Sequence, residues 1–336
     1  MSFDFCVLGN GPLGAAAAWF LSKEGAKVCL IGARPEERVC SHNDHSRIYR
    51  TLHVDPYWTS LAEANHTLML DLQQRTDLDF FRPVPVYYDG GASPIERPER
   101  RYLTRNSFTH QDPNGGILDP LIYISALNQA AREQNTEIRT AVVTSTQFFK
   151  GGHDIQTSDG GSLRCKAVVD FRGLHVVPVG QGVTVARTTL LVRHRPIHES
   201  HCFIRTKLSD PQVAEFFACS HLDRDVRTQT SKFVIADAES IFLNDHERLR
   251  VWFQNDYRNH PKLPWAVEEI RRMGFEIEDL QLAPCAFIRT PNGRPKVEVH
   301  QNHLRFYGCN GSAAKCAQSL ASQIITCHLL KSEFTS

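Results

Sequence analysis

Residues 4–31 constrain the fold of this chain more than any other stretch. An apolar segment runs into Gly9-x-Gly11-x-x-Gly14, an alanine-rich segment follows, and a second apolar run closes the pattern. This order of strand, glycine turn, helix and strand is the setting in which a GxGxxG motif is informative. Gly9 permits the tight turn, Gly11 lets the backbone approach a pyrophosphate, and Gly14 lets the helix pack on the strand. The sequence therefore predicts a dinucleotide-binding βαβ unit, with phosphates at the helix N-terminus.

The composition excludes several classes of protein. A chain of 336 residues holds one large domain or two intertwined ones. Its net charge of +1 offers no electrostatic attraction for nucleic acid or an anionic membrane. The chain enters a strand at once and has no apolar run near the roughly 20 residues of a spanning helix, so we expect no signal peptide and no membrane anchor. The ten cysteines contain no C-x-x-C pair, so we expect reduced thiols and a cytoplasmic location.

Hydrophobic spacing outlines the elements that follow the nucleotide unit. Helices are expected over 56–76, from Asp119 to Gln134, over 264–274 and from Ala313 to Leu330. Asp119 is a favourable N-cap, and Pro120 suits the first turn of its helix. Strands are expected over 136–171, around the turn 159–161, and over most of 183–306, including Trp252-Phe253. Short strands and loops are expected over 80–105.

Long insertions interrupt the nucleotide unit, and a β-rich region follows it. A nicotinamide dehydrogenase alternates strand and helix through its whole dinucleotide domain, so this layout is better suited to FAD. We predict an α/β (α+β) fold with a Rossmann-like FAD-binding domain assembled from discontinuous segments and a β-rich substrate domain. The FAD-binding domain is assigned to residues 1–80, 115–180 and 283–336, and the substrate domain to 81–114 and 181–282.

Four short segments carry a resemblance to a known family. They are CSHNDHSRIYR at 40–50, GILD at 116–119, KAVVDFRG at 166–173 and GCNGSAAK at 308–315. The first contains an arginine pair spaced as R-I-x-R, and the last is a G-x-x-G-x-x-x-K loop before a helix. Their order resembles monomeric sarcosine oxidase and its relatives in the D-amino acid oxidase superfamily. The resemblance implies an FAD-dependent oxidoreductase acting on a small-molecule amine or amino acid.

The resemblance also implies roles for individual side chains. Arg50 and Lys315 match the positions that bind the substrate carboxylate, and Arg47 would lie near the flavin. An arginine holds a carboxylate through a bidentate fork, and a lysine adds a point charge. The alternatives are a structural salt bridge for Arg50 and a solvated first-turn lysine at Lys315. Cofactor contacts are predicted from Gly9, Gly11, Gly14, Ser41, Ser46, Arg47, Gly173, Cys285, Gly311, Ser312 and Lys315.

Cys285 is a candidate for covalent attachment of the flavin. It lies thirty positions before Lys315. In the sarcosine oxidase group, a cysteine at nearly this spacing forms a thioether with the flavin 8α carbon. A thiolate beside stabilising cations is chemically suited to that addition. The alternative is a small buried cysteine, the commonest state of that residue.

The sequence departs from the family pattern at the end of the second strand. An acidic residue usually holds the adenosine ribose at that position, but Gly32 occupies it here. Glu36 or Glu37 could substitute, or the backbone could hold the ribose. Arg34 would suit a phosphate, which keeps NADP open as an alternative cofactor.

A second departure concerns the residue above the flavin. Sarcosine oxidases carry a lysine that assists oxygen reduction within an L-K-x-G-x-H run, and the nearest counterpart here is LRVWFQ at 249–254. That alignment makes Arg250 the replacement for the lysine and Gln254 the replacement for a pocket histidine. Arginine keeps the positive charge but stays protonated. This leaves the electron acceptor open between O2 and another acceptor, and argues for a secondary, cyclic or other bulkier amino acid or amine rather than sarcosine.

Three readings of the function remain open from the sequence. The first is oxidation of a C–N bond by hydride transfer to flavin N5, giving an imine. The second is an FAD dehydrogenase with another acceptor, and the third is a flavin-binding protein that has lost catalysis. A metal at His42, Asp44 and His45 is not expected, because no further ligand cluster accompanies them. We expect a monomer or a small homo-oligomer.

Overall fold

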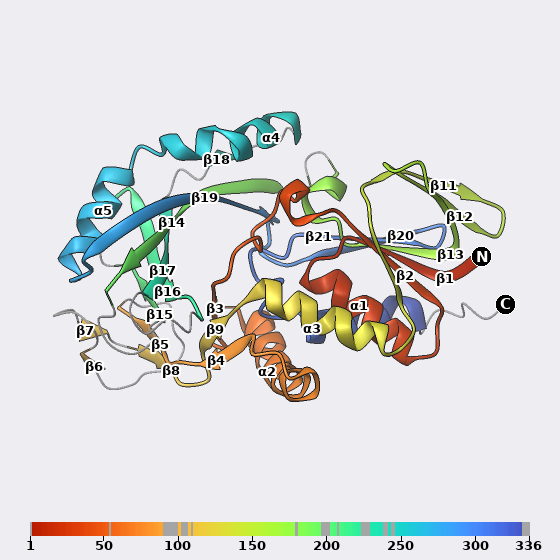
Figure 1. The fold of residues 1–336 in the computed structure, drawn as a ribbon, viewed down its shortest axis with the longest axis horizontal. Coiled ribbons are helices and arrows are strands. Elements are labelled where there is room, and N and C mark those ends of the chain that lie inside the picture. The colour runs from red at the N-terminus through yellow and green to blue at the C-terminus, as the bar shows by residue number, and fades with distance from the viewer. Residues whose placement is uncertain are drawn as a thin grey trace.

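The computed structural model describes most of the chain. The described residues are 2–53, 55–89, 100–101, 107–108, 110–178, 181–195, 202–206, 208–222, 229–237, 241–242 and 246–330. Figure 1 shows two lobes, one built around a mostly parallel sheet that contains the N-terminus, and one built around a second, antiparallel sheet. Among the described residues, no helix is both long enough and apolar enough to cross a bilayer.

The sheet of the first lobe, which we call the nucleotide sheet, is centred on β1. Its strands are β1 (Ser2–Leu8), β2 (Val28–Gly32), β10 (Glu137–Thr140), β11 (Val143–Phe149), β12 (Gly152–Thr157), β13 (Ser162–Asp170), β20 (Lys296–His300) and β21 (His303–Tyr307). β1 runs parallel to β2 and β13, and β10 extends the sheet beside β2. The meander β11–β12–β13 returns to β1, as expected. β13 pairs with β12 along its first half and with β21 along its second.

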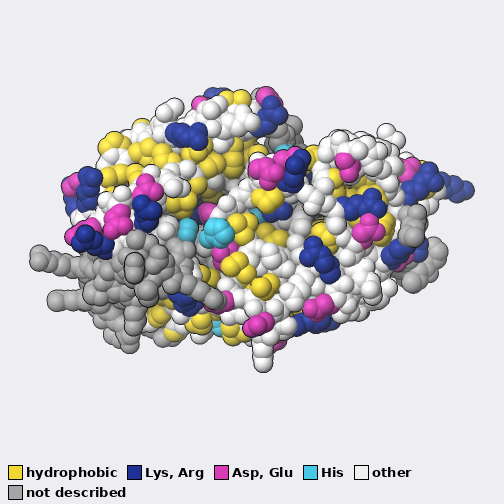
Figure 2. Space-filling view, viewed as in Figure 1, with side chains coloured by type: hydrophobic (Ala, Val, Ile, Leu, Met, Phe, Trp, Pro, Cys, Tyr) yellow, Lys and Arg dark blue, Asp and Glu magenta, His cyan; other side chains and the backbone are white. Residues whose placement is uncertain are grey.

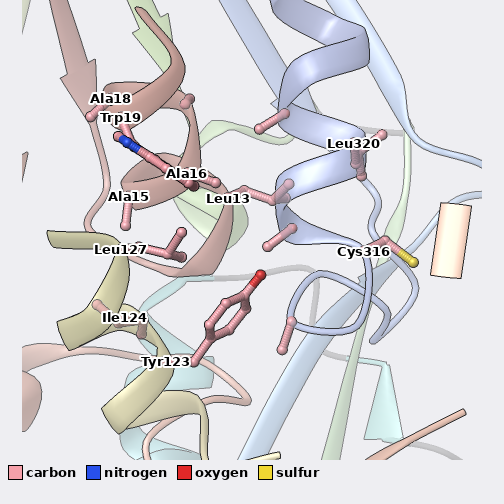
Figure 3. Packing of buried hydrophobic residues seen from close by; sticks show 14 of the residues in the cluster. Leu13, Ala15, Ala16, Ala18, Trp19, Tyr123, Ile124, Leu127, Cys316 and Leu320 are labelled. Carbon is pink, nitrogen blue, oxygen red and sulfur yellow. The ribbon is translucent and has the colours of Figure 1, made fainter. Parts of the chain in front are cut away.

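Three helices cover one face of the nucleotide sheet. They are α1 (Pro12–Lys23), α3 (Pro120–Arg132) and α6 (Ala317–Ile325), with α2 (Pro56–Thr76) packed against α3 and α6. The alanines 15–18 of α1 are completely buried, and their small side chains let the neighbouring helices approach closely. Figure 3 shows this contact, with Leu13 and Leu127 between the helices and Tyr123 directed toward α6. The Tyr123 hydroxyl donates to Gln318 Oε1 at 2.8 Å.

Hydrogen bonds to side chains near the helix N-termini explain where these helices begin. α2 has the predicted bounds, and Asp119 caps α3 by accepting from the N–H groups of Leu121 and Ile122. α6 begins at Ala317, later than the predicted Ala313. The reason is a contact between distant segments: Asn65 Oδ1 accepts from the backbone N–H groups of Gln318 and Ser319 at 2.8 and 3.2 Å. Lys315 therefore lies in the turn before the helix.

The second sheet, which we call the substrate sheet, has the order β18-β14-β17-β16-β15-β5-β8, with β19 on β14. Its strands are β5 (Val86–Tyr88), β8 (His110–Asp112), β14 (Val183–His194), β15 (Cys202–Arg205), β16 (Val213–Ser220), β17 (Gln229–Asp237), β18 (Ile241–Phe242) and β19 (Ile277–Arg289). Helix α5 (Leu263–Arg272) packs on one face through Ala266 and Ile270. The other face is turned toward the nucleotide lobe, where Ser46 Oγ donates to the carbonyl oxygens of Cys219 and Ser220 at 3.2 and 3.0 Å.

Small strands connect the two lobes. β9 (Gly116–Leu118) pairs with β3 (Arg47–Tyr49) and β4 (Phe81–Pro83), and the remaining pair is β6 (Arg100–Arg101) with β7 (Ser107–Phe108). The proposed domain boundary at residue 283 falls inside β19, which pairs with β14 on both sides of that position. The whole of β19 is thus part of the substrate sheet.

Candidate active site

A cavity of about 300 Å³ opens at the carboxyl ends of β1 and β2. Its lining comes from segments far apart in the chain: the glycine turn, the segment 37–42, the turn 171–175 and the loop 306–309. Ligands of open α/β sheets bind at this edge of the strands. In the space-filling view, histidine side chains gather near the middle of the molecule, between the two lobes (Figure 2).

The glycine turn is shaped for a diphosphate. Gly9 has a φ of +101°, and a Cβ there would lie 2.7 Å from the Phe171 carbonyl oxygen. A Cβ on Gly14 would lie only 1.8 Å from the Gly9 carbonyl oxygen. The N-cap of α1 is Gly11, which makes no side-chain capping bond, so the first N–H groups of the helix face the cavity without a side-chain acceptor. These donors and the helix dipole fit an anionic diphosphate.

Gly32 stands where the family pattern has an acidic residue, and the side chain of Asn10 lies next to it. The Asn10 side chain packs over Gly32, where an added Cβ would come within 2.3 Å of Asn10 Cβ. Asn10 Oδ1 is buried and has no hydrogen-bond partner among the described residues, and both Asn10 and Gly32 line the cavity. An unpaired buried oxygen is costly, so the site offers this group to a bound hydroxyl such as that of a ribose. Arg34 is exposed and paired with Glu36 and Glu37, which weakens its predicted preference for a phosphate.

Some of the residues predicted to contact the cofactor line the cavity, and others lie outside its lining. Gly173 and Ser41 line the cavity, and Gly173 has a φ of +62°. Gly308, Cys309 and Ala313 line it as well. A Cβ added to Gly311 would lie 3.8 Å from the Phe287 ring, and Ser312 is buried within the turn before α6. Ser46 is different, because its hydroxyl is bonded to the substrate sheet. The structure therefore gives Ser46 a scaffold role in place of the predicted cofactor contact.

A buried ionic cluster lies beside the cavity, and the sequence reasoning missed two of its members. Asp44 bonds to Arg47 Nη1 and Lys232 Nζ, each at 2.5 Å. Burial alone would raise the pKa of Asp44, but Arg47 and Lys232 outweigh it and hold that pKa well below its usual range. Burial, together with the Arg47 charge, lowers the pKa of Lys232, against the opposing effect of Asp44. The electrostatic neighbours of Arg47 and Lys232 include the Cys285 thiol.

Cys285 occupies the predicted surroundings. It is buried on β19, opposite Arg187 of β14. Its neighbours Ala286 and Ile288 point into a cluster with Trp252 and Tyr257, so Cys285 and Phe287 point to the opposite face. This is the face that Arg47 and Lys232 share. Cys285 therefore lies on the same face of the substrate sheet as two basic side chains.

Arg50 and Lys315 are brought together in a second cluster. Arg50 interacts with the Tyr88 hydroxyl. Burial, with a smaller contribution from Arg50, lowers the pKa of Lys315 to about 7. Burial and the charges of Lys315 and Arg50 also lower the pKa of His53, so its ring is neutral. His53 Nε2 is buried and has no hydrogen-bond partner within the part of the chain that the structure describes, which leaves it available to a ligand.

The strand predicted to include Trp252-Phe253 is wrong, and this segment carries the two predicted catalytic residues Arg250 and Gln254. The segment expected as a strand forms helix α4 (His246–Gln254), in which Leu249 and Trp252 are buried. Arg250 is 63% exposed and pairs with Glu247, and Gln254 is exposed as well. Neither side chain is among those that line the cavity. Lys232 of β17, by contrast, is only 5% exposed.

The histidines near the cavity have partners other than a metal. His45 Nδ1 lies 2.9 Å from Asp119 Oδ2, and Asp44 is occupied by Arg47 and Lys232. The His42 ring lies 3.1 Å from the position of a Cβ on Gly11, and burial lowers its pKa to about 3. Within the described residues, no group of three or more histidine, cysteine or acidic side chains is arranged to hold a metal ion.

Similar proteins are found among curated sequences and solved structures. N-methyl-L-tryptophan oxidase from Yersinia pestis is 24% identical over 197 residues, which are 50% of this chain and 53% of the relative. The chain thus spans about half the length of the curated relatives it matches. NikD, an unusual amino acid oxidase essential for nikkomycin biosynthesis, superposes with a TM-score of 0.67 at 15% identity, over 95% of this chain and 94% of NikD.

Two further solved structures share the fold. L-proline dehydrogenase from P. horikoshii has a TM-score of 0.68 at 12% identity, covering 96% of this chain and 93% of that one. Glycine oxidase from Bacillus cereus has a TM-score of 0.66 at 14% identity, covering 96% and 95%. A family model described as DAO, FAD dependent oxidoreductase, matches residues 4–321. The resemblance inferred from the four segments is confirmed: this chain belongs to the DAO family of FAD-dependent oxidoreductases.

Proposed function

We propose that this protein oxidises the C–N bond of an amino acid, or of another amine that carries a carboxylate, to an imine. The observation that carries the proposal is the pair of basic side chains Arg50 and Lys315, which interact within one partly buried cluster. Two cations held together out of bulk water favour an anionic ligand, and no acidic side chain of the described residues forms an ion pair with either of them. Bound FAD supplies the two-electron acceptor, taking a hydride at N5 from the carbon next to the nitrogen.

The residues of the cluster have complementary tasks. Arg50 would hold the substrate carboxylate in a bidentate fork, with the Tyr88 hydroxyl fixing its guanidinium. Lys315 would add a second charge, and a bound carboxylate would raise its pKa from about 7. The neutral ring of His53 would offer its free Nε2 to the substrate. Together these contacts orient the substrate, which is the main contribution that a protein makes to hydride transfer to a cofactor.

The test of this function is reduction of the purified protein under argon. The panel consists of N-methyl-L-tryptophan, sarcosine, glycine, L-proline and iminodiacetate, and the readout is bleaching of the yellow flavin absorbance. At least one carboxylate-bearing amine should bleach it, while the same amine without its carboxylate should not. A yellow protein that none of these amines bleaches would instead favour the reading that catalysis has been lost.

The acceptor is proposed to be O2, with Lys232 as the cation that stabilises developing negative charge on it. Lys232→Met should slow reoxidation of the reduced protein by about 100-fold and leave anaerobic reduction nearly unchanged, since one preorganised charge contributes on this scale. Stopped-flow mixing with air-saturated buffer measures the rate. Arg250→Met is the control, because Arg250 is exposed on α4 and should leave both rates unchanged. If wild-type protein is reoxidised no faster by air than the variant, another acceptor is indicated.

Cys285 is proposed to bind the flavin covalently. Acid-precipitated wild-type protein should then remain yellow, and Cys285→Ser should release the colour into the supernatant. The matched control is Cys316→Ser, because Cys316 is also buried but lies outside the Arg47–Lys232 cluster. Colour released from wild-type protein would contradict the linkage, and colour retained by Cys285→Ser would place it at another residue.

A further inference from the structure

β16 contains an irregularity at the position of an acidic residue. Its pairing with β17 shifts between Val213, which lies opposite Asp237, and Glu215, which lies opposite Ala236. Val213 and Phe216 both point into the core under α5. In a regular strand, residues 213 and 215 would share a face, so the extra residue turns Glu215 to the face away from α5. Bulges of this kind re-aim a side chain next to functional sites.

The face to which Glu215 turns is the one that borders the nucleotide lobe. Phe217 and Cys219 follow Glu215 on it at alternate positions, and Lys232 lies opposite Cys219. Lys232 bonds to Asp44, and the Cys219 carbonyl accepts from Ser46. Phe217 packs against the cluster that contains Tyr88, the partner of Arg50. Glu215 thus belongs to the wall of the carboxylate-binding cluster.

The Glu215 carboxylate has no direct partner there. It is half-buried, and among the described residues no cation lies within 4 Å of it. It nevertheless interacts with Lys315 through its charge, opposing the effect of burial on that lysine. A partly buried carboxylate that is neither paired nor hydrogen-bonded is unfavourable, and a cationic ligand would remove that cost.

The position along β16 separates Glu215 from the reacting centre. It lies four residues before Cys219, which is opposite Lys232. At a rise of about 3.3 Å per residue, this is roughly 13 Å from the Arg47–Asp44–Lys232 cluster at the flavin side. Glu215 therefore lies along β16 away from the Arg47–Asp44–Lys232 cluster and within reach of the Lys315 charge.

We infer that Glu215 binds a positively charged group on the side chain of the substrate. The substrate class is then an amino acid or carboxylate-bearing amine with a second cationic group, an ammonium or a guanidinium, remote from the reacting nitrogen. The inference rests on the proposed function, since it uses Arg50 and Lys315 as the carboxylate site. It extends that function from a general amino acid to a basic one.

The test compares two ligands that differ by one charge and that the protein does not need to oxidise. Pentanoate and 5-aminopentanoate are titrated into the FAD-loaded protein, and binding is followed by the shift of the flavin absorption spectrum. Wild-type protein should bind 5-aminopentanoate about 10- to 100-fold more tightly, the range of a charge-assisted hydrogen bond. Glu215→Gln should remove this preference, so that the two ligands bind with equal affinity. Glu276→Gln, at an exposed carboxylate, is the matched control.

The alternatives give different results. If Glu215 only balances the charge of Lys315, Glu215→Gln changes the binding of both ligands equally, and the inference is wrong. If Glu215 accepts the proton of the reacting amine, the variant slows anaerobic reduction by L-proline and L-lysine alike, which also overturns it. Equal binding of both ligands to wild-type protein that L-proline still reduces refutes this inference alone. If neither carboxylate binds and no amine reduces the flavin, the proposed function fails together with it.

Discussion

Replacing Lys315 with methionine is expected to slow anaerobic reduction of the flavin by the best substrate of the panel by at least about 30-fold, with FAD still bound. The change removes one of two cations that face the same carboxylate and keeps the length of the side chain. Truncating one member of a buried charged contact costs about 2–5 kcal/mol, which is about 30-fold to several thousandfold in affinity or rate. Stopped-flow absorbance measures the reduction rate, and the flavin-to-protein absorbance ratio reports FAD content.

Two further variants separate the charge of Lys315 from its bulk. Because burial and Arg50 lower the pKa of Lys315 to about 7, its charge is present below that pH and is lost as the pH rises through it. Binding of pentanoate should therefore weaken above pH 7 in the wild type and stay level in Lys315→Arg, which remains protonated. Lys150→Met, at an exposed turn, should behave as the wild type does. Unchanged reduction in Lys315→Met would rule out its role in carboxylate binding.

Replacing Gly14 with alanine is expected to abolish FAD binding, giving a colourless protein whose affinity for added FAD is at least 100-fold weaker. The new Cβ would lie 1.8 Å from the Gly9 carbonyl oxygen, so the turn and α1 must move apart. That movement displaces the N–H groups that the diphosphate needs. Quenching of flavin fluorescence during titration measures the dissociation constant, and circular dichroism shows whether the rest of the chain has folded.

The control for this variant is a glycine where a side chain meets nothing. Gly160 lies in the turn between β12 and β13, and no atom lies within 4 Å of an added Cβ. Its φ of +80° is one that asparagine tolerates, so Gly160→Asn should keep normal FAD affinity. Tight FAD binding by Gly14→Ala would contradict the phosphate-binding role of the turn.

Local signals predicted the first lobe well. The strand, the glycine turn and α1 lie where the motif indicated, because each feature depends on neighbours within about ten residues. The same holds for the cap of α3 at Asp119, whose side chain bonds two and three residues ahead. The family resemblance supplied Arg50 and Lys315, 265 positions apart in the chain, which no periodicity could have joined.

The sequence reasoning failed where contacts connect distant strands. Lys232 and Asp44 are separated by 188 positions, and Glu215 became visible only through the register of β16. The error over 249–254 had a different cause. Leu249 and Trp252 are three positions apart and both buried, which is helical spacing, and the segment forms a helix where a strand was expected.

The ion pair between Asp44 and Lys232 can form only after the strand that carries Lys232 has been synthesised. Asp44 is synthesised 188 residues before Lys232. Until Lys232 is synthesised, the Asp44 carboxylate and Arg47 cannot pack against the strand of the second lobe that carries it. The strand that completes the core around β1 is available earlier, at residues 162–170. The glycine turn and its neighbouring strands are therefore synthesised before the strand that carries Lys232, whereas the loop 306–309, which lines the same cavity, is synthesised after it.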